Sequence, residues 1–118
     1  MREIKFRAWS NEERQYVYSD TFAKASGKRF GLTDFFKFTD ISILEQYTGR
    51  KDKNGKKLYE GDILRDYDEG YLYQVVYYKD DTAFKYYDFI NGDYYWYVDL
   101  PIFEIIGNIH ETPELLND

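Results

Sequence analysis

The sequence of 118 residues contains no cysteine, which excludes disulfide bonds, thiolate zinc sites and cysteine nucleophiles. It also has no long apolar run. The longest stretch without a charged side chain is residues 70–78, far short of the roughly 20 residues that a membrane-spanning helix needs. The sequence therefore predicts a protein without a membrane span, and the lack of cysteine fits a reducing, cytoplasmic setting.

Patterns that carry catalysis or hold a cofactor are also missing. His110 is the single histidine, so a zinc site would lack the several nitrogen or sulfur ligands that it normally needs. No serine stands in a nucleophile-elbow pattern, and no glycine-rich loop of the Walker or dinucleotide type is present. Paired acids such as Asp66 and Asp68 are typical of solvated strands and turns. We predict a protein that is not an enzyme and has no cofactor or metal site.

Hydrophobic residues make up 43% of the chain and charged residues 32%, enough to bury a core under a solvated surface. At this length the chain makes one domain. Aromatic residues reach 21%, and eleven of the fourteen tyrosines follow residue 58. Tyrosine suits half-buried strands and binding interfaces equally well, so the count alone does not decide between them.

Short segments with the two-residue alternation of strands recur along the chain at intervals of roughly ten residues. The predicted strands are residues 3–9, 15–18, 41–47, 71–78, 83–90, 94–98 and 103–109. Residues 71–98 read as a β-meander, and residues 112–116 can begin a short terminal helix. Residues 21–40 fit a short helix as well as a strand. The pattern predicts a mainly β, small antiparallel domain of the barrel or roll type, with an N-terminal hairpin and at most short helices.

Adjacent tyrosines in the late strands cannot both face one side, because successive strand residues point to opposite faces. At least one member of each pair is therefore expected to face away from the core, on an exposed aromatic surface. The candidate partner-binding residues are Tyr86, Tyr87, Tyr94 and Tyr95. They favour a non-catalytic protein-binding module, since interfaces are rich in tyrosine.

Residues 50–57 form a basic segment around Asn54-Gly55, a dipeptide typical of tight turns. The candidate basic loop comprises Arg50, Lys51, Lys53, Lys56 and Lys57. It supports an alternative function, nucleic-acid binding, in which these side chains contact phosphates and tyrosines stack on bases. The net charge of −6 opposes that alternative.

The two halves of the sequence carry opposite charge. Residues 1–57 hold 13 Lys and Arg against 8 acids, a net of +5, and residues 58–118 hold 3 against 14, a net of −11. If strands of both halves interleave, the charges neutralise one another. If the two halves occupy separate surfaces, the molecule is dipolar and formation of a homo-oligomer is favoured. A separate acidic surface would also allow the protein to mimic DNA and inhibit a DNA-binding protein.

Three blocks of the sequence carry a family resemblance. They are Ile4-Lys5-Phe6-Arg7-Ala8-Trp9; residues 46–56 with Tyr59-Glu60-Gly61-Asp62-Ile63; and residues 106–116, beginning Ile106-Gly107-Asn108-Ile109-His110. In this order and spacing they resemble the YopX family of bacteriophage and prophage proteins. The resemblance covers nearly the whole chain, whereas residues 21–40 and 65–103 match only in general character.

The resemblance implies a single YopX-like domain over residues 1–118. Residues 1–47 would provide N-terminal strands and a variable insert, and residues 48–118 an SH3-like barrel. It implies a protein encoded by a phage or integrated element that works in the bacterial cytoplasm, and it implies no activity. The expected partner of the protein-binding module, which the tyrosines favour, is an unidentified host or phage protein. Within the blocks, Gly61 permits a tight bend, Asp62 can accept hydrogen bonds from the preceding turn, and Gly107 indicates a bulge or a close backbone approach.

Overall fold

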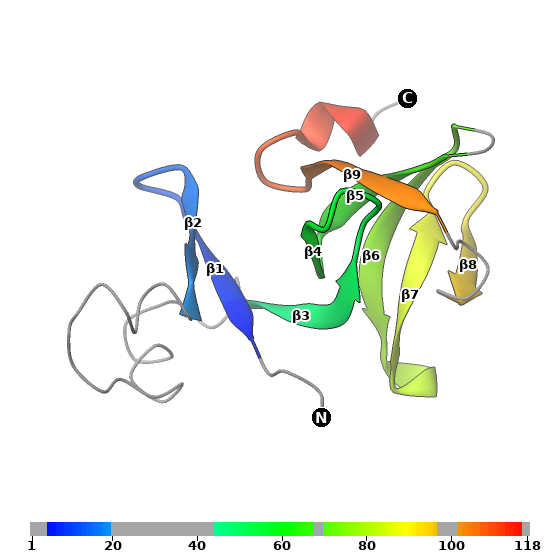
Figure 1. Cartoon of the computed structure of the whole chain (residues 1–118), viewed down its shortest axis with the longest axis horizontal. Coiled ribbons are helices and arrows are strands. Elements are labelled where there is room, and N and C mark those ends of the chain that lie inside the picture. Colours follow the sequence, from blue (N-terminus) through cyan, green and yellow to red (C-terminus); the bar gives the residue numbers. More distant parts are fainter. Residues whose placement is uncertain (1–4, 20–43, 68–69, 97–101, 117–118) are drawn as a thin grey trace. The chain divides into compact units, whose positions relative to one another are not determined.

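The computed structural model describes residues 5–19, 44–67, 70–96 and 102–116, and the chain divides into two compact units, residues 1–47 and 48–118. The described secondary structure consists of antiparallel strands and two short 3-10 helices (Figure 1). The predicted mainly β fold is therefore confirmed. Residues 20–43 lie outside the described residues, and they include residues 21–40, for which the sequence fitted a short helix as well as a strand.

The first unit contains the predicted N-terminal hairpin. Strand β1 (Phe6–Ser10) pairs antiparallel with β2 (Gln15–Tyr18), and Trp9 lies opposite Tyr16. The rings of these two residues meet edge to face with centroids 5.1 Å apart. On its other side β1 pairs with the first residues of β3 (Leu44–Lys51), where Ala8 lies opposite Leu44. Aromatic pairs and a three-strand ladder thus hold this unit together.

Arg7 departs from the pattern of a half-buried strand. The alternation predicts a solvent-facing side chain, but Arg7 is 3% exposed. Its Nε donates to Oε1 of the buried Glu45 at 2.7 Å, and its guanidinium lies 3.9 Å from the Tyr16 ring centroid. The ion pair and the ring contact compensate for the loss of hydration, which is how a charge is tolerated in the interior.

The second unit is a five-stranded sheet with the order β8-β7-β6-β5-β9, curled into a half-barrel (Figure 1). Its strands are β5 (Asp62–Asp66), β6 (Leu72–Tyr78), β7 (Ala83–Asp88), β8 (Asp93–Trp96) and β9 (Phe103–Asn108). The meander β6–β8 matches the prediction. Strand β5 precedes it and pairs with β6, and β9 returns to pair with β5. Strand β4 (Lys57–Tyr59) neighbours β3 instead. The 3-10 helix η2 (Lys79–Asp81) joins β6 to β7, and η4 (Pro113–Leu116) follows β9.

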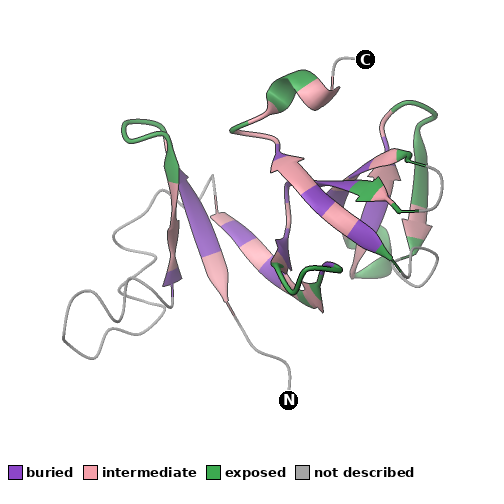
Figure 2. Cartoon of the chain, turned by 45° about the horizontal axis from the view of Figure 1, so that its top comes forward, coloured by how far each residue is buried: buried purple, intermediate pink, exposed green. Residues whose placement is uncertain are grey.

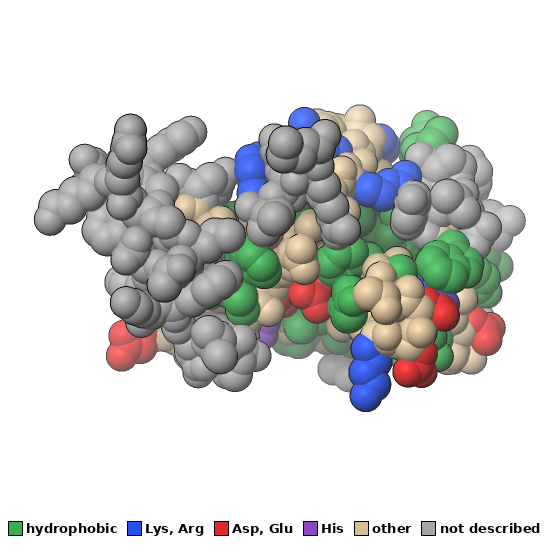
Figure 3. All heavy atoms as spheres, turned by 90° about the horizontal axis from the view of Figure 1, so that it is seen from below, with side chains coloured by type: hydrophobic (Ala, Val, Ile, Leu, Met, Phe, Trp, Pro, Cys, Tyr) green, Lys and Arg blue, Asp and Glu red, His purple; other side chains and the backbone are tan. Residues whose placement is uncertain are grey.

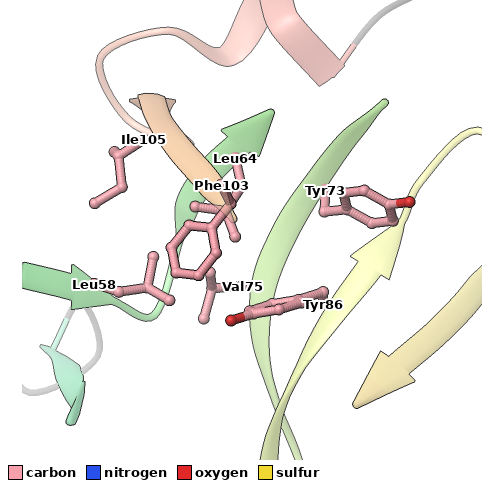
Figure 4. Close-up of a cluster of buried hydrophobic side chains, with 7 residues drawn as sticks. All are labelled: Leu58, Leu64, Tyr73, Val75, Tyr86, Phe103 and Ile105. Atoms are coloured by element: carbon pink, nitrogen blue, oxygen red, sulfur yellow. The ribbon is translucent and has the colours of Figure 1, made fainter. Parts of the chain in front are cut away.

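A cluster of seven buried side chains fills the inner face of this sheet (Figure 4): Leu58, Leu64, Tyr73, Val75, Tyr86, Phe103 and Ile105. The Tyr86 and Phe103 rings have centroids 5.7 Å apart. Buried and half-buried residues alternate along β9, as the banding in Figure 2 shows. Burial of this apolar surface is the main stabilising contribution to the fold.

The segment 50–57 differs from the predicted loop, because strand structure in β3 continues through Arg50 to Lys51. The reversal comprises residues 52–56, with Gly55 at φ 81°. The turn therefore starts at residue 52, two residues later than predicted. At the other end of the chain, the predicted terminal helix is a single 3-10 turn, η4.

Candidate functional site

Strand β7 divides the tyrosines between two faces of the sheet. Tyr86 is 1% exposed and belongs to the core, whereas its neighbours Lys85 and Tyr87 point to the opposite face. Tyr95 lies opposite Tyr86 on β8 and packs against the same core. Two of the four tyrosines expected on an exposed surface, Tyr86 and Tyr95, therefore belong to the inner face.

The other two tyrosines meet on the opposite face. Tyr87 pairs with Tyr94 across β7 and β8, and their ring centroids are 4.8 Å apart. Tyr94 is also 4.8 Å from the ring of Tyr78, so it lies in contact with both. The register places Trp96 two residues further along β8, opposite Lys85. We call Tyr78, Tyr87, Tyr94 and Trp96 the outer aromatic face.

Lys85 is built into this face. Its Nζ lies 4.4 Å from the ring centroid of Tyr78 and 4.3 Å from that of Trp96. It also forms an ion pair with Asp81 of η2, and its side chain is only 9% exposed. A lysine ammonium at this distance from two rings gains cation–π attraction while its alkyl stem covers apolar surface.

Part of the outer aromatic face is open to solvent. Tyr94 is 46% and Trp96 45% exposed, values well above those of an ordinary core ring. Exposed acids lie close by in sequence: Asp80 and Asp81 in η2, and Asp93 beside Tyr94. Within the second unit, Figure 3 shows hydrophobic side chains at the surface beside acidic and basic ones. Exposed aromatic groups in contact with one another are typical of interaction surfaces.

The basic segment lies near the other edge of the sheet. The Lys53 N–H donates to the carbonyl of Phe103 at 3.0 Å, which places the turn beside β9, while β8 is the opposite edge strand. Arg50 Nη1 donates to the Tyr86 hydroxyl at 3.1 Å. Lys53 Nζ is 3.7 Å from Glu104 and 4.6 Å from the Tyr67 ring centroid.

The structure therefore does not bring the basic segment and the predicted tyrosines into one exposed site. Lys51 and Lys56 are exposed, and Lys57 is half-buried. Arg50 contacts Tyr86 through the hydroxyl of a tyrosine that is itself buried in the core. The aromatic neighbours of the basic segment are instead Tyr67 and Phe103.

Asp52 organises the turn of this segment and was not singled out from the sequence. It is 7% exposed. Oδ1 accepts the N–H groups of Asn54 and Lys56, both at 2.9 Å, and Oδ2 accepts the N–H of Ile105 at 3.1 Å. Burial raises the pKa of Asp52, but these three hydrogen bonds and the charge of Lys56 outweigh it and hold the pKa below 3.8. The sequence signal was an aspartate two residues before Asn-Gly, as in an Asx turn.

Gly61 and Asp62 form a corner between β4 and β5. Gly61 has φ 86°, and Asp62 Oδ2 accepts the Tyr59 N–H at 2.8 Å while the carboxylate is almost fully buried. The Ile109 N–H also donates to the Gly61 carbonyl at 3.0 Å. These contacts give both residues a structural role in joining strands.

Gly107 lies next to a β-bulge. Ile63 pairs with Gly107 and Leu64 pairs with Ile105, so Ile106 is the additional residue. A Cβ at position 107 would lie 2.0 Å from Thr112 Oγ1. Thr112 Oγ1 accepts the Asn108 N–H at 3.0 Å, which holds the segment before η4 against the end of β9. The glycine thus provides space for the C-terminal turn.

Buried acids limit the surface available for mimicry of DNA. Asp62 is 2% and Asp88 7% exposed, and both accept backbone N–H groups in turns. Hydrogen bonds from Asn91 and Ile90 lower the pKa of Asp88 although burial raises it. These two carboxylates cannot belong to a row of exposed phosphate-like charges.

Metal-ligating clusters and membrane-spanning helices are both absent from the part of the chain that the structure describes. Among residues 5–19, 44–67, 70–96 and 102–116, no group of three or more His, Asp or Glu side chains could hold a metal ion. In the same ranges, no helix has the length and apolar character needed to cross a membrane.

Comparison with known proteins gives a family and a fold. No curated protein matches the chain. Among solved structures, the crystal structure of protein EF1440 from Enterococcus faecalis is similar, with a TM-score of 0.62 and 26% sequence identity over 98% of this chain and 99% of that one. The family model described as YopX protein matches residues 5–117. The chain belongs to the YopX family.

Proposed function

We propose that this protein is a non-catalytic protein-binding module, acting in the bacterial cytoplasm on a host or phage protein, and that its contact surface is the outer aromatic face. The observation that supports this proposal is the exposure of Tyr94 and Trp96, each close to half, within a set of rings already in mutual contact. Rings fixed by their neighbours lose little conformational entropy on binding, which is why aromatic residues dominate interface energetics.

The position of the face at one edge of the sheet adds to this argument. Strand β8 is the last strand in the order β8-β7-β6-β5-β9. An edge strand is exposed along its side as well as its face, so a partner can contact both Tyr94 and the backbone beside it. The inner face is filled by the core and offers no comparable surface.

Site-specific photo-crosslinking tests the proposal. A benzophenone amino acid is introduced at position 94 and, as a matched control, at position 71, because Tyr71 is a tyrosine at least as exposed as Tyr94 and lies outside the outer aromatic face. After irradiation in an extract of Enterococcus faecalis, the source of the similar structure, we expect a discrete adduct from position 94 alone. Unlabelled protein in excess should suppress it.

Two results would count against this function. Equal crosslinking from positions 71 and 94 would indicate random encounters. Absence of any adduct from position 94 in extracts of bacteria that carry a member of the family would leave the face without a partner.

The nucleic-acid alternative receives less support from the structure. Glu104 partly offsets the charge of Lys53. Arg50 already uses a donor on the Tyr86 hydroxyl. A gel-shift assay at about 50 mM salt, where phosphate contacts are strong, is the matching test. A shift abolished by reversing the charges of Lys51 and Lys56 would favour that alternative over the protein-binding module.

A further inference from the structure

We infer that the outer aromatic face binds arginine side chains, so that the partner contacts this protein through a basic segment. This inference rests on the proposed function and names the chemistry of the partner. It is carried by the contacts of Lys85, by the exposure of the neighbouring rings and by the charge of the surrounding residues.

The first step is that this face already holds a cation. Lys85 Nζ lies over two of its four rings, Tyr78 and Trp96, at 4.4 and 4.3 Å. The face of an aromatic ring is electron-rich and attracts a positive charge, most strongly when water is excluded. The rings are thus arranged in a way that stabilises an ammonium or guanidinium group in contact with them.

The second step is that ring surface remains after Lys85 is accommodated. Tyr94 contacts the rings of Tyr78 and Tyr87 and is still 46% exposed. Trp96 contacts Lys85 and is still 45% exposed. An incoming planar group can therefore stack on the solvent side of Tyr94 or Trp96 without displacing the lysine.

The third step is the sign of the charge. Residues 58–118 contain 14 acids and 3 bases. Of these bases, Lys85 pairs with Asp81 and Arg65 with Glu104. Exposed Asp80 and Asp93 flank the face in sequence, and Lys79 is the exposed base near them. With Lys85 already paired with Asp81, the exposed acids Asp80 and Asp93 outnumber the exposed base Lys79, and an excess of this sign favours a cationic partner over an anionic one.

Arginine is favoured over lysine by its shape and hydration. The guanidinium is planar, stacks on aromatic rings and is less strongly hydrated than an ammonium, so it loses less on leaving water. Its fork of N–H groups can also donate two parallel hydrogen bonds to an exposed carboxylate, which an ammonium cannot match.

Nuclear magnetic resonance provides the test, because the chain has two tryptophans and hence two indole N–H signals. Trp96 reports on the face, and the buried Trp9, whose indole donates to Asn11, is an internal control. The Trp96→Phe variant assigns the signals. An octa-arginine peptide, an octa-lysine peptide and an octa-glutamate peptide are titrated at 150 mM salt.

We expect the Trp96 signal to shift saturably with octa-arginine, at several-fold lower concentration than with octa-lysine, and not with octa-glutamate. The Trp9 signal should stay in place. Tyr94→Ser should weaken binding about three- to five-fold, the effect of losing one exposed cation–π contact, whereas Tyr71→Ser should not change it. Folding of each variant is checked by the remaining dispersed amide signals.

Three results would overturn the inference: equal shifts of both indoles, equal affinity for the arginine and lysine peptides, or no shift of Trp96. A shift of Trp96 on simple concentration of the protein would instead identify a second copy of this chain as the occupant. An adduct from position 94 in the crosslinking experiment, together with a silent Trp96, would leave the proposed function intact and reject only the arginine chemistry.

Discussion

Asp52 Oδ2 accepts the backbone N–H of Ile105 at 3.1 Å, although 53 residues separate the two in sequence. The same carboxylate accepts two N–H groups of its own turn through Oδ1. One buried side chain therefore joins the β3–β4 turn to strand β9. Since an isolated β-turn contributes little stability by itself, this link gives the turn a fixed place in the second unit.

We expect Asp52→Asn to lower the free energy of unfolding by about 2 to 3 kcal/mol, because it removes a charged acceptor from three backbone donors and places an NH₂ group against one of them. Urea unfolding followed by circular dichroism measures the change. The matched control is Asp80→Asn, an exposed acid in η2, which should change stability by less than about 0.5 kcal/mol. Equal effects of the two substitutions would contradict the proposed link.

The stability of the second unit should fall in acid because of Asp52 and Asp88. The pKa of each is lowered below 3.8 in the folded protein, so near that pH the unfolded chain binds more protons than the folded one. Their contribution to the free energy of unfolding is present above the unfolded-state pKa. It is lost as the pH falls through the lower pKa values of the folded state.

Urea unfolding between about pH 2 and pH 6 tests this dependence. The wild type should lose stability more steeply below pH 3.8 than Asp52→Asn or Asp88→Asn, and the curves should converge at the acid end. Parallel curves would show that neither carboxylate contributes to the acid sensitivity.

Gly107→Ala should destabilise the C-terminal turn by about 1 to 3 kcal/mol, as overpacking does. The new Cβ would lie 2.0 Å from Thr112 Oγ1 and 3.1 Å from Leu115 Cδ1. Adding Thr112→Ala removes the first clash, so in a double-mutant cycle the combined cost should be smaller than the sum of the single costs. Additive costs would show that the contact with Thr112 does not require the glycine.

Neighbouring tyrosines of the meander should respond very differently to substitution. Tyr86→Ser empties a core position and removes the acceptor of Arg50, so we expect a loss of about 3 to 5 kcal/mol. Tyr94→Ser removes a half-exposed ring and should cost about 1 kcal/mol or less. Thermal unfolding compares the two, and a cost for Tyr94 as large as that for Tyr86 would contradict the division of faces.

Much of the fold follows from the sequence because strand alternation and turn residues are local signals. The hairpin at residues 15–18 and the meander of β6, β7 and β8 were predicted close to their observed bounds. The start of the 52–56 turn was misplaced, since Arg50 and Lys51 are polar and yet belong to β3. The burial of Arg7 depends on Glu45, which pairing of distant strands brings beside it, so no local pattern reveals it.

The candidate site was predicted in part. Alternation requires adjacent tyrosines to face opposite sides, but it does not say which member faces the core. That choice depends on a distant strand: β9 pairs with β5, and Phe103 of β9 lies beside the Tyr86 ring. Lys85 and Trp96 were missed because a charged residue and a single tryptophan carry no local signal of a shared face. The register of β7 and β8 is what unites them.

The alternation along β7 separates two structural roles within six residues. Tyr86 and Asp88 maintain the shape of the half-barrel, whereas Lys85 and Tyr87 contribute to what that shape displays. Substitutions at the exposed positions of the outer aromatic face, Tyr94 and Trp96, can accumulate at small energetic cost. Under the proposed function, members of such a lineage could change their partner while the scaffold beneath stays the same.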